Sequence, residues 1–188
     1  MGAVAGPRAH GHRPLASLDV ELEEAIRGRR THKVYGSAPV DRVTLEELLE
    51  LARWAPNHHL TEPWEFRVIG PDTLAAMKQA AGPENAAKLD RAPTLVGVSV
   101  VQTGDPVQDE EDLLATGCAV YAVLLGAHAR GLVGYWRTPG FLRTPAGAAA
   151  LGLEPNEHFL ALIHLGEQRQ DPRPPERSPV SEYVSFLP

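Results

Sequence analysis

The stretch APTLVGVSVV, residues 92–101, carries the clearest structural signal in the chain. Its apolar side chains fall on both faces of an alternating pattern and β-branched valine dominates, which is typical of a strand buried in the middle of a sheet. A long helical segment follows over residues 106–130, and its second half, GCAVYAVLLGAHA, is apolar almost all round. We therefore predict a central sheet with a long, buried helix packed against it.

Shorter elements are predicted around this pair. Thr44 and Glu47 form a capping box, which predicts the start of a helix that Pro56 ends after Ala55. This order of helices and strands predicts an α+β fold in which a sheet is sandwiched by helices. The other elements follow from apolar spacing and from Gly or Pro at their ends: a helix from near Asp19 to Gly28, a strand over 64–69, a helix from Asp72 to Gly82, a strand over 132–136, a helix over 146–151 and a strand over 159–165.

The two ends of the sequence differ from the middle. Residues 1–18 are rich in Gly, Ala, Pro and His, which predicts a disordered tail and leaves one domain over residues 19–188. The two histidines on this tail, His10 and His12, are not expected to form a metal site. The segment DPRPPERSPV, residues 171–180, holds too many prolines for a packed helix. We expect it to run extended along a surface such as that of a second subunit.

Composition excludes several classes of function. The formal net charge of −6 and the pI of about 5.7 argue against a nucleic-acid partner or an anionic membrane. No strongly apolar run in the sequence reaches the roughly 20 residues that span a bilayer. No signal peptide is recognisable, and Cys118 is the single cysteine, so neither a disulfide within the chain nor a cysteine-based zinc site is possible. A cytoplasmic location is expected.

The usual motifs of self-sufficient catalysis are missing. The sequence contains no Walker loop, GxGxxG, HExxH, GxSxG or CxxC. If the protein is an enzyme, a bound cofactor is therefore expected to carry its chemistry.

One candidate ligand segment is RGRRTHK, residues 27–33, which places four fixed cations and a hydroxyl within seven residues of an acidic protein. Guanidinium groups bind phosphate through paired N–H donors, and a threonine hydroxyl adds another. The alternative is a solvated run of charge, which composition alone favours.

Two further segments follow rigid elements. WAPNHHLTEPWEF, residues 54–66, is a loop rich in His and Asn between a helix and a strand, and it is equally compatible with an ordinary loop. GYWRTPG, residues 134–140, places an aromatic ring, an arginine and a threonine at a strand end, which suits a planar anionic ligand. Trp136 could equally cap the core, and Cys118 is expected to act as a small hydrophobe.

Taken in order, these segments resemble the nitroreductase family of FMN enzymes over residues 23–183, closest to its compact bacterial subgroup. Arg29 to Lys33 stands where that family has its Arg-Arg-Ser-x-Arg signature. The remaining matches are Ala55-Pro56 with Pro63-Trp64, Gly117-Cys118-Ala119 in the long helix, Gly134 to Thr138, and His164-Leu165-Gly166.

The resemblance implies a homodimer of α+β subunits, each with a central, mostly antiparallel sheet, and two FMN sites at the subunit interface. It implies that Arg29 and Thr31 hold the phosphate and ribityl chain with Arg30 nearby, and that Lys33 faces the N1/O2 edge of the flavin. Trp136, Arg137 and Thr138 would line the same pocket, and His58 would arrive from the partner subunit.

The implied activity is the reduction of nitroaromatic or quinone-like small molecules with NADH or NADPH, by ping-pong hydride transfer. A cation near N1 favours reduction of the flavin, and no acid–base pair is then needed. Two alternatives share the fold: a flavoenzyme that oxidises its substrate, and a non-catalytic FMN-binding redox sensor. This chain has Leu60 and Glu62 where larger members have Asn and Gln, and Trp54 where the compact subgroup can carry arginine, so substrate preference does not transfer.

Overall fold

The computed structural model describes residues 21–188. These residues form one four-stranded sheet with helices around it. The strands lie in the order β1-β2-β4-β3, and all three neighbouring pairs are antiparallel. This confirms the antiparallel sheet implied by the family resemblance. The strands are β1 (Trp64–Val68), β2 (Thr94–Val101), β3 (Leu132–Arg137) and β4 (Glu157–Glu167).

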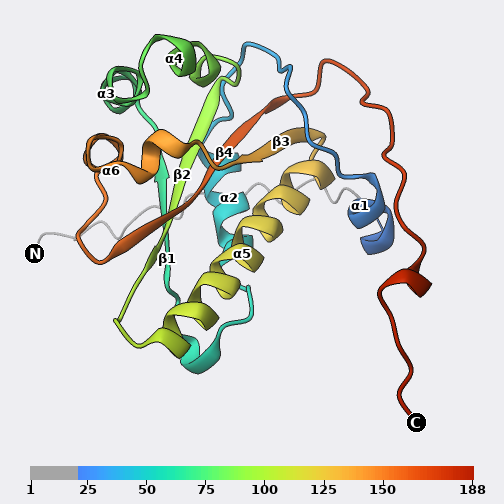
Figure 1. The fold of residues 1–188 in the computed structure, drawn as a ribbon. Coiled ribbons are helices and arrows are strands. Elements are labelled where there is room, and N and C mark those ends of the chain that lie inside the picture. Colours follow the sequence, from blue (N-terminus) through green and yellow to red (C-terminus); the bar gives the residue numbers. More distant parts are fainter. Residues whose placement is uncertain (1–20) are drawn as a thin grey trace, which may run out of the picture.

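Helices cover both faces of the sheet, as the sequence predicts (Figure 1). On one face lie α2 (Arg42–Ala52) and the long α5 (Pro106–Ala129). The other face carries α3 (Pro71–Ala81), α4 (Pro83–Leu89) and α6 (Pro145–Leu151). The short helix α1 (Leu22–Gly28) packs beside α5, and single 3-10 turns occur at η1 (His58–Leu60), η2 (Gly140–Arg143) and η3 (Val180–Glu182).

Strand β2 is the buried centre that its sequence predicts. Val96 and Val98 pack into the cluster beneath α2 and α5, whereas Leu95 joins the cluster beneath α3, α4 and α6. Gly97 lets α6 pack closely against the strand, since a Cβ at this position would lie only 2.6 Å from Leu151 Cδ1 of α6. The strand is apolar on both sides because it serves two cores.

The start of α2 differs from the prediction. Its N-cap is Asp41, whose side chain accepts hydrogen bonds from the backbone N–H (3.0 Å) and the hydroxyl (2.7 Å) of Thr44. The predicted capping box of Thr44 and Glu47 is therefore wrong, because an aspartate three residues earlier makes a stronger cap and adds a turn. The helix also ends at Ala52, before the predicted Ala55.

The segment after β1 holds one helix more than predicted. Asp72 lies in the first turn of α3, whose N-cap is Gly70 with Pro71 as the first helical residue. Gly82, at φ 71°, turns the chain, and Pro83 then begins α4. The prediction used Gly82-Pro83 only as an end, although proline is also favoured at the first position of a helix.

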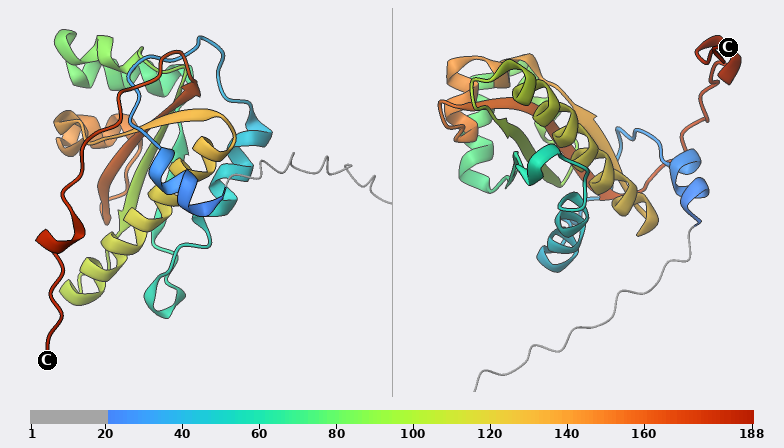
Figure 2. Two further views of the ribbon diagram at one scale, coloured as in Figure 1. Left: turned by 90° about the vertical axis from the view of Figure 1, so that its right-hand side faces the viewer. Right: turned by 90° about the horizontal axis from the view of Figure 1, so that it is seen from below.

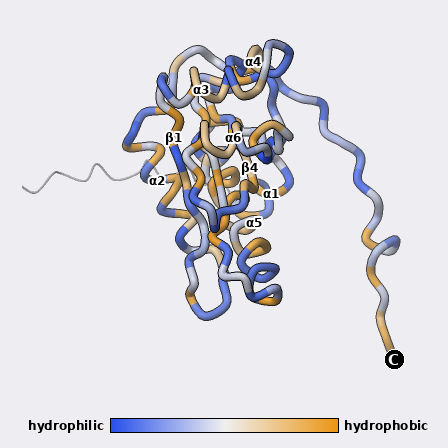
Figure 3. The backbone as a smooth tube through the Cα atoms, turned by 60° about the vertical axis from the view of Figure 1, so that its left-hand side comes forward, coloured by the Kyte–Doolittle hydropathy of each residue, from blue (hydrophilic) through white to orange (hydrophobic). Residues whose placement is uncertain are grey.

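Helix α5 is buried on one face only, which corrects the prediction for its second half. Ala115, Ala119 and Val123 lie in the core. Along its outer face Leu114, Cys118 and Tyr121 are exposed, and Figure 3 shows apolar residues on this helix. By length and composition α5 could cross a membrane, which the sequence reading overlooked, but its packing against the sheet is that of a core helix.

The C-terminal segment leaves the sheet after β4 and runs extended, as predicted. Residues 170–179 form no regular structure, and the segment extends away from the body past α1 (Figure 2). Val180, Phe186 and Leu187 on it are exposed apolar side chains.

The predicted tail over residues 1–18, with His10 and His12, lies outside the described residues, so the division into a tail and a domain over 19–188 stays a prediction.

Candidate flavin site

Two of the predicted ligand segments lie side by side at the edge of the sheet. Thr31 forms a parallel bridge with Gly134 of β3, and the His32 N–H donates to the Gly134 carbonyl over 3.3 Å. Since β3 is an edge strand, its outer side is free to accept this extra segment. The bridge brings Arg29–Lys33 next to the strand that carries Trp136, Arg137 and Thr138.

The chain beyond Thr31 is fastened to the end of the sheet. His32 is buried, and its carbonyl accepts a 2.6 Å hydrogen bond from the Tyr35 hydroxyl. Tyr35 itself bridges to Gln168, and the Gly36 N–H donates to the Glu167 carbonyl. These contacts fix the backbone of the cationic segment between α1 and the end of β4, while the side chains of Arg27 and Lys33 stay exposed.

Helix α5 sets two of the candidate side chains on one side of the molecule. The guanidinium carbon of Arg29 lies 5.9 Å from the centroid of the Tyr121 ring. One turn earlier, Gly117 faces Trp136, since a Cβ on this glycine would lie 3.7 Å from Trp136 Cη2. Residues four apart share a helix face. Arg29 and Trp136 therefore adjoin neighbouring turns of α5.

A pocket of about 650 Å³ opens where α1, α5 and the C-terminal segment meet. Its walls hold four guanidinium groups and one carboxylate, so it attracts anions. Its volume is in the range of small-molecule and cofactor sites. The lining residues are Glu23, Ile26, Arg27, Arg29, Arg30, Tyr121, Pro175, Arg177 and Tyr183.

Arg29 has a donor available for an anionic ligand. Its Nε is buried and has no hydrogen-bond partner among the described residues. Arg30, by contrast, donates to the carbonyls of Arg27 and Arg29, where its charge also suits the C-terminal end of α1. Buried polar groups are nearly always bonded, and guanidinium groups pair well with phosphate. The pocket thus fits the phosphate of a nucleotide cofactor.

The histidines near this pocket, His32 and His128, have lowered pKa values. Burial lowers the pKa of His32, and the nearby His128 lowers it further. Burial also lowers the pKa of His128, with added effects from Arg29 and Arg30. The positive charge of the pocket is therefore supplied by the arginines and stays constant across the physiological pH range.

The remaining residues of the two segments point in different directions. Lys33 and Thr138 are exposed. Arg137 donates to the carbonyl of Lys88 over 3.4 Å and lies 5.8 Å from the Tyr135 ring centroid, on the face that carries α4. Because side chains alternate along a strand, Arg137 and Trp136 leave β3 on opposite faces. The structure therefore separates Arg137 from the pocket that Arg29 lines.

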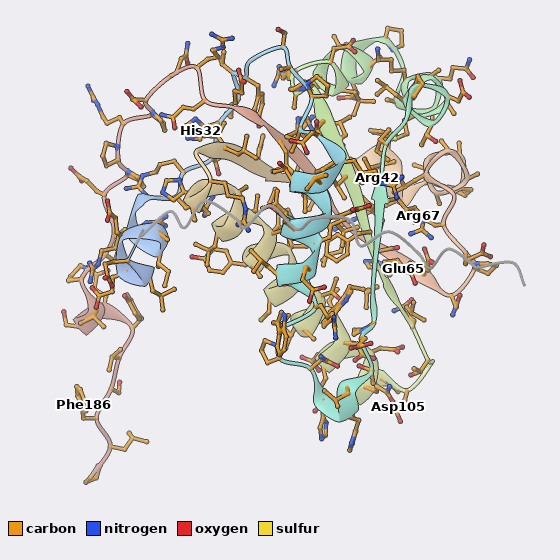
Figure 4. All side chains as sticks on the ribbon, turned by 180° about the vertical axis from the view of Figure 1, so that it is seen from behind. His32, Arg42, Glu65, Arg67, Asp105 and Phe186 are labelled. Carbon is orange, nitrogen blue, oxygen red and sulfur yellow. The ribbon has the colours of Figure 1, made fainter. Side chains whose placement is uncertain are left out.

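His58 lies at the far end of α5. Its Nδ1 is 2.7 Å from Glu111 Oε2, and both side chains line a second, 270 Å³ pocket with Asp105. Tyr121 comes ten residues after Glu111, which is about 15 Å along the helix axis. Figure 4 likewise shows Asp105 and His32 at opposite ends of the molecule. Within one chain His58 does not reach the arginine pocket, and its predicted arrival from a partner subunit stays a prediction.

The loop that carries His58 is strained. His59, Leu60 and Glu62 have φ angles of 57°, 52° and 45°, and they are the non-glycine residues with positive φ within residues 21–188. The left-handed conformation costs roughly 1–2 kcal/mol for such a residue. Leu60 is nonetheless 80% exposed, and nearby Trp54 is 76% exposed. Strained backbone that presents apolar side chains to solvent is typical of a functional loop.

No metal centre is arranged in the described part of the chain, where no three His, Cys, Asp or Glu side chains gather around one point. The second pocket, despite His58, His59 and Asp105, is no exception.

Sequence reasoning missed six residues of the arginine pocket, namely Glu23, Ile26, Tyr121, Pro175, Arg177 and Tyr183. Tyr121 lies on a helix predicted to be buried all round, and Arg177 and Tyr183 belong to the C-terminal segment. An arginine inside a proline-rich extended segment was a usable signal for Arg177, because such a segment holds a side chain at a surface without a helix or strand. Tyr121 and Tyr183 had no comparable signal.

Comparisons with known proteins agree with this fold. A family model described as "Nitroreductase family" matches residues 26–167. YfhC of Bacillus subtilis (strain 168), named as a candidate NAD(P)H nitroreductase, is 27% identical over 177 residues, covering 86% of this chain and 91% of that protein.

Solved structures with the same fold include two that cover nearly the whole chain. The nitroreductase-like family protein from Bacillus cereus has a TM-score of 0.82 at 24% identity, over 89% of this chain and 96% of the other. A candidate nitroreductase from Desulfovibrio desulfuricans, solved in complex with FMN, has a TM-score of 0.75 at 28% identity, over 88% and 96%.

Proposed function

Because the chain belongs to the nitroreductase family, and is therefore an NAD(P)H-dependent flavin oxidoreductase, we propose that it reduces nitroaromatic or quinone-like acceptors by a ping-pong mechanism. The observation that carries this proposal is the arginine pocket. The buried Nε of Arg29, which has no hydrogen-bond partner within residues 21–188, suits a phosphate monoester. FMN ends in such a group.

The residues proposed to hold FMN come from the two segments joined by the Thr31–Gly134 bridge. Arg29 binds the phosphate, Thr31 adds a hydroxyl donor towards the ribityl chain, and Arg30 adds positive charge. Trp136, which lies against Gly117 of α5, would border the flavin ring from that side. Thr138 and Arg137 belong to the same strand end, and Arg137 would have to leave the Lys88 carbonyl to contact the cofactor.

When bound, FMN supplies hydride transfer from NADH or NADPH to the acceptor. Lys33 is exposed beside the bridge and keeps a positive charge at the proposed N1/O2 edge. A fixed cation favours the charge that develops there, without a proton-transfer residue. The protein's part is thus to bind, orient and stabilise charge.

We propose that the active unit is a homodimer. The outer face of α5 exposes Leu114, Cys118 and Tyr121, and the C-terminal segment exposes further apolar side chains. Exposed apolar surface of this extent favours a protein partner. A second copy would cover both features and would bring the partner subunit's His58 to the flavin, across the distance that separates it from Arg29 in one chain.

Anaerobic reduction tests the function directly. The purified protein should show the flavin absorbance bands, and NADH or NADPH should bleach them within seconds to minutes. Addition of a quinone should then restore the oxidised spectrum. A flavin that stays oxidised with both nicotinamides would favour the redox sensor instead. Rapid oxygen uptake with an organic substrate, without nicotinamide, would favour an oxidising flavoenzyme.

A further inference from the structure

The loop over residues 57–62, here called the His58 loop, is tied to α5 by one buried group. The Thr61 hydroxyl donates to Asp112 Oδ1 over 2.6 Å. Asp112 is only 2% exposed, although it lies in the acidic run of residues 109–112 whose other members are more accessible. The bond joins the strained stretch of backbone to α5, the longest helix in the described part of the chain.

Asp112 is an unusual group to bury at this place. Its side-chain partners among the described residues are the Thr61 hydroxyl and, at 3.5 Å, the Gln108 amide. Neither carries a positive charge, and a buried carboxyl without a cation is costly for folding. Its burial therefore needs an explanation beyond stability, and the strained loop that it holds supplies one.

The other contacts of the loop do not explain its conformation. Asn57 closes the loop locally, because its side chain accepts from the Glu62 N–H (3.0 Å) and donates to the Ala55 carbonyl (3.1 Å). The left-handed residues themselves are exposed, so core packing does not force them. Thr61 lies between Leu60 and Glu62, and its hydroxyl bonds this part of the loop to the buried carboxylate of Asp112.

The geometry points to Asp112 as a positioning residue: by accepting the Thr61 hydrogen bond it holds the His58 loop in the left-handed conformation that sets His58 for the acceptor side of the flavin site. This assignment rests on the proposed function. Glu111, the preceding residue on α5, bonds His58 itself, so adjacent carboxylates fix the loop backbone and its histidine. The histidine is then presented preformed to an acceptor, with little ordering left to occur on binding.

The test compares three variants of the full-length protein. Thr61→Val removes the hydroxyl but keeps the shape of the side chain, whereas Thr61→Ser keeps the hydroxyl. Thr116→Val is the matched control: it makes the same change at a buried threonine whose hydroxyl donates to the main-chain oxygen of Asp112 over 2.8 Å, a bond internal to α5. Each variant is measured by hydrogen exchange at the Thr61 and Glu62 amides, and by KM and kcat with menadione as the quinone.

In Thr61→Val, exchange at both amides should accelerate about tenfold to a hundredfold, as expected for loss of a hydrogen bond to a carboxylate. KM for menadione should rise about tenfold while kcat changes less than about twofold, because the loop contributes binding that is equal in the ground and transition states. Thr61→Ser should stay near wild type. Thr116→Val should keep wild-type exchange at the loop and wild-type KM, even where its melting temperature falls.

Equal loop exchange in Thr61→Val and Thr116→Val would overturn the assignment, and so would accelerated exchange with an unchanged KM. If Thr61→Val does not fold, Asp112→Asn replaces it, with exchange expected to rise by a few-fold because a neutral acceptor is weaker. Unchanged exchange in that variant would also overturn the assignment. A wild-type protein that neither binds FMN nor turns over would instead refute the proposed function, since the exchange measurements do not depend on it.

Discussion

The guanidinium carbon of Arg29 lies 5.9 Å from the centroid of the Tyr121 ring, and both residues line the proposed flavin pocket. The contact joins the segment after α1 to the exposed face of α5, so a single arginine serves both the pocket and the surface where a partner subunit is proposed. The buried Nε of Arg29 has no hydrogen-bond partner among the described residues, so it is available to a ligand.

Arg29→Leu should weaken FMN binding much more than folding. Loss of charge-assisted hydrogen bonds to phosphate should cost about 1.5–3 kcal/mol, or roughly tenfold to a hundredfold in affinity. Titration of the apo-protein with FMN measures the dissociation constant of each variant. Arg42→Leu is the control, because the Arg42 side chain is 90% exposed, pairs with Glu46 of its own helix and is not among the residues that line the pocket. An unchanged dissociation constant for Arg29→Leu would remove this residue from the site.

Steady-state kinetics should be ping-pong. Nicotinamide and acceptor would use one open face of the flavin in turn, and the chain has no GxGxxG motif to hold a nicotinamide elsewhere. Double-reciprocal plots against NADH or NADPH at several fixed acceptor concentrations should give parallel lines. Lines that converge would mean that both substrates are bound together and would contradict the single-face mechanism.

Leu114→Glu should convert the proposed homodimer into a monomer. Leu114 is 65% exposed on the outer face of α5, and a dimer that covers this face would have to bury the new charge. An obligate interface here should bury more than about 2,000 Å². Light scattering at micromolar concentration gives the mass of each species. Val43→Glu, at an equally exposed position of α2, should leave the mass unchanged. A wild-type monomer that still holds FMN would refute the dimer.

His164 should make the protein sensitive to mild acid. The side chain is 1% exposed, neither ring nitrogen has a partner among the described residues, and burial lowers its pKa to about 3, with smaller effects from Arg137 and Arg91. The tyrosine rings that face it, Tyr35 and Tyr135, add no charge that would stabilise the imidazolium.

The sign follows from the lowered pKa. The unfolded chain takes up a proton near pH 6.5, whereas the native protein does so only near pH 3, so stability is full above pH 6.5 and falls as the pH drops towards 3. The slope contributed by this residue is at most about 1.4 kcal/mol per pH unit. Urea unfolding between pH 7 and 4.5 should show a shallower decline for His164→Leu than for wild type. Equal slopes would assign the acid sensitivity to other groups, including His32 and His128.

Much of the fold follows from the sequence because the signals are long. The pattern of β2 extends over eight strand residues and that of α5 over 24, which is enough for alternation and helical spacing to be distinguished. Short elements have weaker sequence signals, as α4 shows. Gly82-Pro83 is compatible with both the end of one helix and the start of the next. The missed Asp41 cap shows the same ambiguity over a single turn.

The candidate site is harder to predict, because its contacts are far apart in the sequence. Thr31 meets Gly134 across about a hundred residues, and only the family resemblance suggested that they share a pocket. The opposite directions of Trp136 and Arg137 could have been predicted from strand alternation alone. The role of Asp112 could not, since in the acidic run of residues 109–112 nothing in the sequence distinguishes the carboxyl that turns inward.

The arginine pocket takes one wall from residues 23–30 and another from residues 175–183, with the whole sheet between them in the sequence. The core can therefore fold while the emerging chain still lacks the second wall, so the order of events during synthesis is sheet first and pocket last. Four guanidinium groups repel one another until an anion arrives, and a ligand that binds only the closed arrangement stabilises it. The supply of flavin would then decide how long this segment stays open to proteases in a newly made molecule.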